Sequence, residues 1–275
     1  MKVFLKSFLK GFLFLNLLML TLPSWRGNAA GIPDLIKKIE LRRGIWTGLQ
    51  AGITIRFTTA SGQEASCQGA LVYQRLDEKI LLQCYSTKNH RLFALKTTDR
   101  EFELYLPSHR TVYKGSIFTL EDSPEIESHL RAWDLYRAFK PMVVPSENVS
   151  AAPLEDNLTL LTISRGGEPP AISREIKVSP EGDILSETYY AANGKPSVEI
   201  QRSEFQTIGA ETAGVPTVYP RQIRIISHKW VALEESITET IFTFQQADFL
   251  AEIREDSFKM SLPKSTKVMV LEDPI

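Results

Sequence analysis

The sequence predicts a mainly β protein of the α+β class. We expect a single strongly curved antiparallel sheet of about ten or eleven strands that forms an unclosed β-barrel, with helices covering its concave face. Short runs of leucine, aromatic and β-branched residues recur between polar turns, and one of these runs alternates strictly between apolar and polar residues. Two stretches have helical spacing instead.

Length and composition predict one folded domain behind a signal peptide. No composition break or long linker divides the 275 residues, so we expect a domain over 30–275 with a helical insertion at about 118–157. Residues 1–29 have the parts of a secretory signal: three lysines, an apolar run over 12–22 and small residues at 27–29. We therefore expect a periplasmic protein. An uncleaved inner-membrane anchor is the alternative, although the apolar run is short for a membrane span.

The net charge argues against nucleic acid as a partner. The formal charge of the full chain is −1, and removal of residues 1–29 takes away four basic residues and no acidic one, which gives −5. Binding to phosphates needs a concentrated basic surface. We therefore expect no nucleic-acid partner. We also expect a monomer.

Cys67 and Cys84 are the two cysteines of the chain. If the turn between their strands centres on residues 76–78, the position opposite Cys67 is near residue 87 or 88, and Cys84 then lies about 10 Å or more from Cys67. A disulfide needs Cα atoms within about 7 Å. The spacing therefore predicts two reduced, buried thiols.

The first half of the chain predicts a helix followed by a β-meander. Residues 32–41 carry apolar side chains at helical spacing. In the alternating run, Phe102 and Leu104 share the apolar face, whereas Tyr105 falls on the face that can meet water. The strands expected in this half are 46–59, 65–75, 79–85, 92–96, 101–106 and 111–115.

The second half opens with a helix and then returns to strands. Ser123 is a plausible N-cap with Pro124 at the first helical position, and the helix should end before Pro141. We expect this helix to pack over the sheet, and residues 143–156 to form a surface connection. The candidate strand segments of this half are 158–164, 174–178, 184–191, 197–208, 221–227, 231–244 and a last run over 258–263, so the segments of both halves slightly outnumber the ten or eleven strands expected in the sheet.

Residue patterns give little support to an enzyme. The four histidines are not at metal-ligand spacing from one another or from a cysteine, and no Gly-x-Ser-x-Gly motif is present. We therefore expect no catalytic residues, no metal and no cofactor.

The alternating residues of the meander define a candidate ligand cavity. Its expected lining is Phe57, Leu71, Tyr73, Leu82, Phe93, Phe102 and Leu104 from the strands, with Ile126, Leu130 and Trp133 from the helix. The same spacing is compatible with an ordinary packed core, because periodicity marks burial and not what fills the space. Arg75 shares the strand parity of Leu71 and Tyr73, and it either reaches to the rim or gates the cavity mouth.

Three segments resemble a known family. Residues 69–75, the step 98–100 with the strand that follows it, and residues 258–264 are similar to the Gly-x-Leu-x-x-x-Arg-Pro, Ser-Asp-Gly and terminal Phe-x-x-x-Pro patterns of the periplasmic lipoprotein carrier LolA and its superfamily. The resemblance implies an unclosed barrel plugged by helices, with acyl chains in its cavity. It also implies that the arginine of the first pattern, here Arg75, bonds to the lid in the closed state.

The sequence departs from the family at defined positions. Leu76 replaces the proline of the first pattern, Arg100 replaces the glycine of the second, and the insertion adds a helix. The resemblance predicts a non-enzymatic carrier of lipids or lipoproteins, with an inner-membrane release complex and an outer-membrane acceptor as its further partners. Two alternatives remain: a periplasmic envelope-stress regulator that binds an inner-membrane partner, and a structural protein whose own side chains fill the cavity.

Overall fold

The computed structural model gives a three-dimensional arrangement for most of the chain. The residues that it describes are 31–42, 47–98, 100–117, 132–139, 144–145, 147–166, 171–208, 217–231, 234–250 and 252–271. Within these ranges no helix is long and apolar enough to span a bilayer. The expected signal segment 1–29 lies outside them.

Fourteen strands of the described residues form one sheet, in the order β14-β6-β5-β4-β3-β2-β1-β13-β12-β11-β10-β9-β8-β7. The first meander contains β1 (Gly48–Thr58), β2 (Glu64–Gln74), β3 (Lys79–Tyr85), β4 (Arg91–Thr97), β5 (Glu101–Leu106) and β6 (Thr111–Ser116). The second contains β7 (Val149–Pro153), β8 (Thr159–Arg165), β9 (Ala171–Val178), β10 (Ile184–Tyr190), β11 (Pro196–Ile208), β12 (Thr217–Val231) and β13 (Glu234–Leu250). Pairing of β13 with β1 joins the two meanders.

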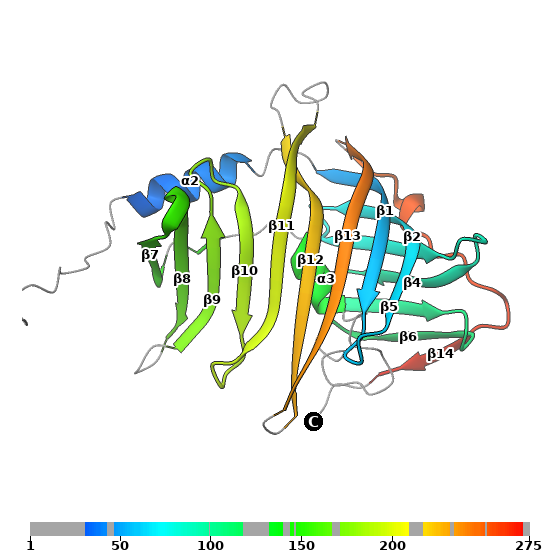
Figure 1. Ribbon diagram of the computed structural model, residues 1–275. Coiled ribbons are helices and arrows are strands. Elements are labelled where there is room, and N and C mark those ends of the chain that lie inside the picture. The colour runs from blue at the N-terminus through cyan, green and yellow to red at the C-terminus, as the bar shows by residue number, and fades with distance from the viewer. Residues whose placement is uncertain are drawn as a thin grey trace, which may run out of the picture.

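The sheet is strongly curved and does not close (Figure 1). Strands β4 to β6 run almost across the direction of β8 to β11 in that view, and β7 and β14 remain as the two edges. This confirms the predicted fold class, an unclosed β-barrel of the α+β type, although the sheet has more strands than expected. It is also not wholly antiparallel, because β14 (Lys267–Val270) pairs in parallel with β6.

Helix α2 (Ile32–Arg42) confirms the first predicted helix and covers one end of the second meander (Figure 1). Ile39 is buried there in a small apolar cluster with Val144, Leu161, Ile163, Ile176 and Val178. The Arg42 guanidinium donates to both carboxylate oxygens of Asp183, at 3.0 and 2.9 Å. Gly182 has φ +96°, and a Cβ there would lie 2.8 Å from the carbonyl carbon of Lys38, so this turn needs glycine to approach the helix.

Helix α3 (Ala132–Phe139) lies inside the curve of the sheet, where it contacts β12 and β4 (Figure 1). It occupies the last part of the predicted second helix, whose earlier residues are outside the described ranges. Beneath it, one apolar cluster extends from the first meander to β11, β12 and β13. The concave face of the sheet is therefore its apolar face, as the alternation predicted.

The chain after β13 packs on the opposite, convex face of the first meander. Phe258, at the end of the 3₁₀ helix η6 (Glu255–Phe258), is buried with Leu81. Tyr105 is also buried there, where Met260 packs against its cluster, so the expectation that Tyr105 meets water is wrong. A long-range segment covers this face, which local alternation does not reveal.

Two further expectations are corrected by the strand assignment. Residues 258–263 form no strand, whereas β14 follows them at 267–270. The expected surface connection 143–156 contains an edge strand, β7, which pairs with β8. Both new strands are short, with five and four residues, and lie at sheet edges, where so short a run carries little strand signal.

The two cysteines form a disulfide, which corrects the prediction of two reduced thiols. The Cα atoms of Cys67 and Cys84 are 5.9 Å apart. Register pairs Gly69 with Cys84, so Cys67 lies diagonally across from Cys84 on the same face of the sheet. The prediction assumed a shifted register and ignored the twist that brings such diagonal neighbours together.

Candidate functional site

The predicted lining residues of the strands all join the apolar cluster on the concave face. Phe57, Leu71, Tyr73, Leu82, Phe93, Phe102 and Leu104 are each no more than 7 % exposed. Ile126 and Leu130 lie outside the described residues, and Trp133 belongs to α3 without a described side chain. The structure thus brings the seven strand residues together on one surface, and their use as an acyl site remains a prediction.

Apolar contacts hold one side of α3 against the strands. Phe139 packs edge-on against Phe242 and Phe244 of β13, with ring centroids 5.0 and 6.3 Å apart. Leu135 and Ala138 are buried in the same cluster. The spacing of these three α3 residues is helical, so one face of a short amphipathic helix closes over the sheet.

Polar contacts attach α3 to β11 and β12. The Ser227 hydroxyl donates a hydrogen bond of 2.7 Å to the Asp134 carboxylate, and both residues are buried. The Arg202 guanidinium donates to the backbone carbonyl of Ala138 at 3.2 Å, near the C-terminal end of the helix. Each of these hydrogen-bonding groups can bond to another polar group when α3 moves. In this respect α3 differs from a helix that is held by apolar packing alone.

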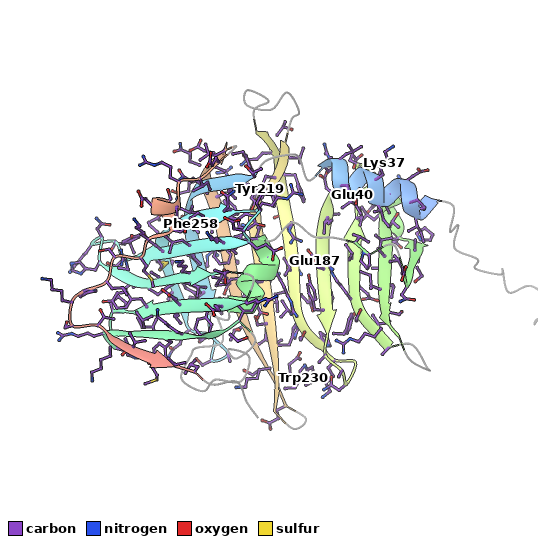
Figure 2. All side chains as sticks on the ribbon, turned by 180° about the vertical axis from the view of Figure 1, so that it is seen from behind. Lys37, Glu40, Glu187, Tyr219, Trp230 and Phe258 are labelled. Atoms are coloured by element: carbon purple, nitrogen blue, oxygen red, sulfur yellow. A yellow bond between two sulfur atoms is a disulfide. The ribbon has the colours of Figure 1, made fainter. Side chains whose placement is uncertain are left out.

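A charged cluster lies beside this helix on the concave face (Figure 2). Glu187 is 1 % exposed, and its carboxylate accepts bonds from Arg174 at 2.9 Å, Arg202 at 2.6 Å and the Tyr189 hydroxyl at 2.8 Å. We call Arg174, Glu187, Tyr189 and Arg202 the arginine cluster. Charge-assisted bonds of this kind are stronger than neutral ones, so the cluster is a firm part of the concave face.

Strand register explains the position of the arginine cluster. Glu187 of β10 pairs with Ile176 of β9 and with Ile200 of β11. Arg174 lies two residues before Ile176 and Arg202 two residues after Ile200, so both occupy diagonal positions within reach of a long side chain. Ile176 belongs to the apolar cluster under α2 and Ile200 to the one under α3, so the charges separate the two apolar surfaces.

Burial keeps the tyrosines near the cluster in their neutral form. Burial, with the neighbouring Glu187 carboxylate, raises the pKa of Tyr189 well above its ordinary value. Burial also raises the pKa of Tyr219, and the positive charge of Arg202 opposes this shift. Both hydroxyls therefore remain protonated even at alkaline pH values at which an exposed tyrosine ionises, and Tyr189 stays a hydrogen-bond donor to Glu187.

Histidine and carboxylate groups of the described residues do not form a metal centre. No group of three or more His, Cys, Asp or Glu side chains within these ranges could hold a metal ion. His228 lies on the convex face between two carboxylates, with Nδ1 2.6 Å from Glu235 and Nε2 3.3 Å from Glu199.

Solved structures with a similar fold come from several bacteria. A protein domain from Vibrio parahaemolyticus, described as an outer membrane lipoprotein-sorting domain, aligns with TM-score 0.55 and 10% identity over 84% of this chain and 97% of its own. A LolA-superfamily protein from Nitrosomonas europaea aligns with TM-score 0.50 and 11% identity, over 83% and 97% of the two chains. The chain has a LolA-like fold.

A third structure agrees with this LolA-like fold. A DUF1329-family protein from Desulfovibrio piger aligns with TM-score 0.55 and 11% identity, over 82% of this chain and 95% of its own. No protein-family model and no curated protein matches the sequence.

Arg75 is the residue to which the LolA resemblance assigns the gate. It follows β2 in the turn to β3, is partly exposed, and donates its backbone N–H to the carbonyl of Thr47 at 2.7 Å. Because β2 ends at Gln74, the strand parity expected with Leu71 and Tyr73 does not determine where the Arg75 side chain points, and its gating role stays a prediction. Among the described contacts of this LolA-like fold, Arg202 bonds to the backbone of α3, and this residue was not predicted from the sequence.

The missed residues of the LolA-like concave face carried a usable signal. Arg174 shares the parity of Ile176 and Val178, and Arg202 shares that of Val198 and Ile200. In the sequence, Arg75 stands out as a charge at an inward position of an apolar row. Arg174 of β9 and Arg202 of β11 meet the same condition.

Proposed function

We propose that this protein is a non-enzymatic periplasmic carrier that holds the acyl chains of lipids or lipoproteins against the concave face of its sheet. The observation that supports the proposal is a helix, α3, laid over a continuous apolar surface and attached to it partly by polar contacts. Displacement of such a helix would uncover an apolar surface that an acyl chain can cover. Each methylene that becomes buried contributes up to about 0.8 kcal/mol.

The similar structures also support a carrier of lipoproteins, because one of them is described as an outer membrane lipoprotein-sorting domain. In this proposal, residues 1–29 direct export, an inner-membrane release complex delivers the cargo, and an outer-membrane acceptor receives it. Detection of the chain in the periplasmic fraction, with an N-terminus after residue 29, would support the export step. Detection of the chain in the inner membrane with residues 1–29 still attached would instead support the uncleaved anchor.

Lipid binding is tested on protein purified without detergent. Mass spectrometry should find co-purifying lipid, or the protein should bind a fluorescent fatty acyl probe that unlabelled lipid displaces. Protein that is free of lipid and does not bind the probe would contradict the carrier. Seven strand residues in the predicted lining give a matched series of variants for locating the bound probe.

The regulator alternative makes a different prediction in the same cells. If the protein is a carrier, its affinity capture after crosslinking should recover lipoproteins. Recovery of an anti-sigma factor of the inner membrane in their place would favour the regulator and contradict the carrier.

A further inference from the structure

The arginine cluster holds more positive than negative charge. Arg174 and Arg202 share the single carboxylate of Glu187, and their side chains are only 14 % and 10 % exposed. Arginine remains protonated at all ordinary pH values, so neither charge can be removed by titration. A buried cation without its own counter-ion is costly, so this pair favours the approach of a second anion.

Helix α3 adds a third guanidinium to this region. Arg137 lies over the ring of Tyr189 at 4.4 Å from its centroid, and Arg174 lies 4.9 Å from the same centroid. Two guanidinium groups therefore lie close to one tyrosine ring, next to the Glu187 carboxylate to which that tyrosine donates.

Arg174 also has an unused donor. Its Nη2 bonds to Glu187, whereas its Nε is buried and has no hydrogen-bond partner among the described residues. Buried donors without a partner are uncommon in folded proteins, and the Nε atoms of Arg91 and Arg224 are the other arginine examples in the described residues. An oxygen-bearing ligand beside Arg174 would satisfy it.

Arg202 holds a weaker partner that an anion could replace. Its Nη2 donates to the carbonyl of Ala138, a neutral acceptor on the helix that covers the concave face. A phosphate or carboxylate oxygen carries a negative charge of its own, so it attracts the guanidinium more strongly than a neutral carbonyl does. Exchange of the Ala138 carbonyl for such an oxygen would detach the C-terminal end of α3 from β11.

We infer that Arg174 and Arg202 bind the anionic headgroup, a phosphate or carboxylate, of the amphiphile whose acyl chains lie on the concave face. This inference rests on the proposed carrier function and adds the class of its ligand. The cluster lies between the two apolar surfaces, so a headgroup bound there has apolar surface on both sides for its chains. The planar guanidinium matches both phosphate and carboxylate geometry.

The test compares two oleoyl lipids that differ in charge, together with inorganic phosphate, by titration of the purified protein. Oleoyl lysophosphatidate should bind about tenfold or more tightly than uncharged monooleoylglycerol, since charge-assisted hydrogen bonds are worth at least this factor. Arg174→Gln should remove the difference. Arg224→Gln is the matched control, because Arg224 pairs with Glu239 on the other face of the same sheet.

Each outcome decides a separate point. Equal binding of the two lipids by the native protein would overturn the headgroup site and leave the carrier intact, and this comparison needs no variant. Phosphate binding that depends on Arg174, with lysophosphatidate no tighter than phosphate, would overturn it in favour of a free anion. No binding of either lipid would overturn both the site and the carrier. Faster hydrogen exchange of α3 amides with lysophosphatidate, and not with monooleoylglycerol, would support the exchange at Arg202.

Discussion

At the scale of single residues, Glu187 is the counter-ion of two buried arginines. Replacement by Gln keeps the shape and leaves Arg174 and Arg202 without a negative charge at 14 % and 10 % exposure. We expect Glu187→Gln to lower the free energy of unfolding by about 3 to 5 kcal/mol, as measured by urea denaturation. Glu239→Gln, which breaks the more exposed pair with Arg224, should cost only about 0 to 1 kcal/mol. Equal losses in the two variants would contradict the role given to Glu187.

The disulfide gives a second prediction at this scale. Replacing both Cys67 and Cys84 by Ala opens a covalent loop of sequence separation 17, and we expect a loss of about 3 kcal/mol in the free energy of unfolding. Thiol titration of the denatured, unreduced native protein should find no free thiol. Two thiols per chain in that titration would restore the prediction made from the sequence.

At the scale of elements, residue patterns predicted the helices and strands whose formation depends on neighbouring residues in the sequence. The alternation over 101–106 gave the bounds of β5, and helical spacing placed α2 correctly within a residue. Strands β7 and β14 were missed because they form by pairing with another strand, β8 and β6 respectively, and not from a pattern in their own residues. The four residues of β14 are all exposed, and they pair with β6 more than 150 positions earlier in the chain.

The candidate site also has one part that the sequence predicted and one part that it did not. Period-two alternation identified seven residues that share one buried surface, since side-chain parity follows directly from strand geometry. The arginine cluster was missed because an inward Glu187 is stable only with partners from two other strands. Parity could have marked Arg174 and Arg202 as inward charges, but their pairing with Glu187 required the register of β9, β10 and β11.

Strand β2 offers a matched pair of variants on its two faces. Leu71 is 1 % exposed and points into the apolar cluster, whereas its neighbour Ala70 is exposed on the other face. Because the cluster has no partner for a buried charge at this position in the described residues, Leu71→Glu should lower the free energy of unfolding by at least about 3 kcal/mol. Ala70→Glu should change it by no more than about 0.5 kcal/mol. A modest loss in Leu71→Glu combined with loss of acyl-probe binding would indicate a lined cavity in place of a packed core.

At the scale of the whole molecule, a ligand can reach the part of the apolar concave face that α3 covers only if this helix moves away from the sheet. The concave face is divided by the arginine cluster into a surface under α2 and a larger one under α3. The described polar attachments of α3 come from β11 and β12, in the second meander. A helix held in this way can have a closed and an open state, and a ligand that needs the open state binds more weakly by the fraction that is closed.

Weakening the closed state should therefore strengthen the apparent binding of an acyl ligand and slow its release. Ser227→Ala removes the hydroxyl that bonds to Asp134 of α3 and leaves the arginine cluster unchanged. A hydrogen bond to a charged group contributes about 1.5 to 3 kcal/mol, so we expect roughly tenfold tighter binding of an acyl probe and faster hydrogen exchange in α3. The gate that the LolA resemblance assigns to Arg75 predicts the same two changes in binding for Arg75→Leu, whereas a rim position for Arg75 predicts none. Measuring affinity and off-rate in both variants shows which meander controls the opening, and unchanged values in Ser227→Ala would exclude the attachment at β12 from that role.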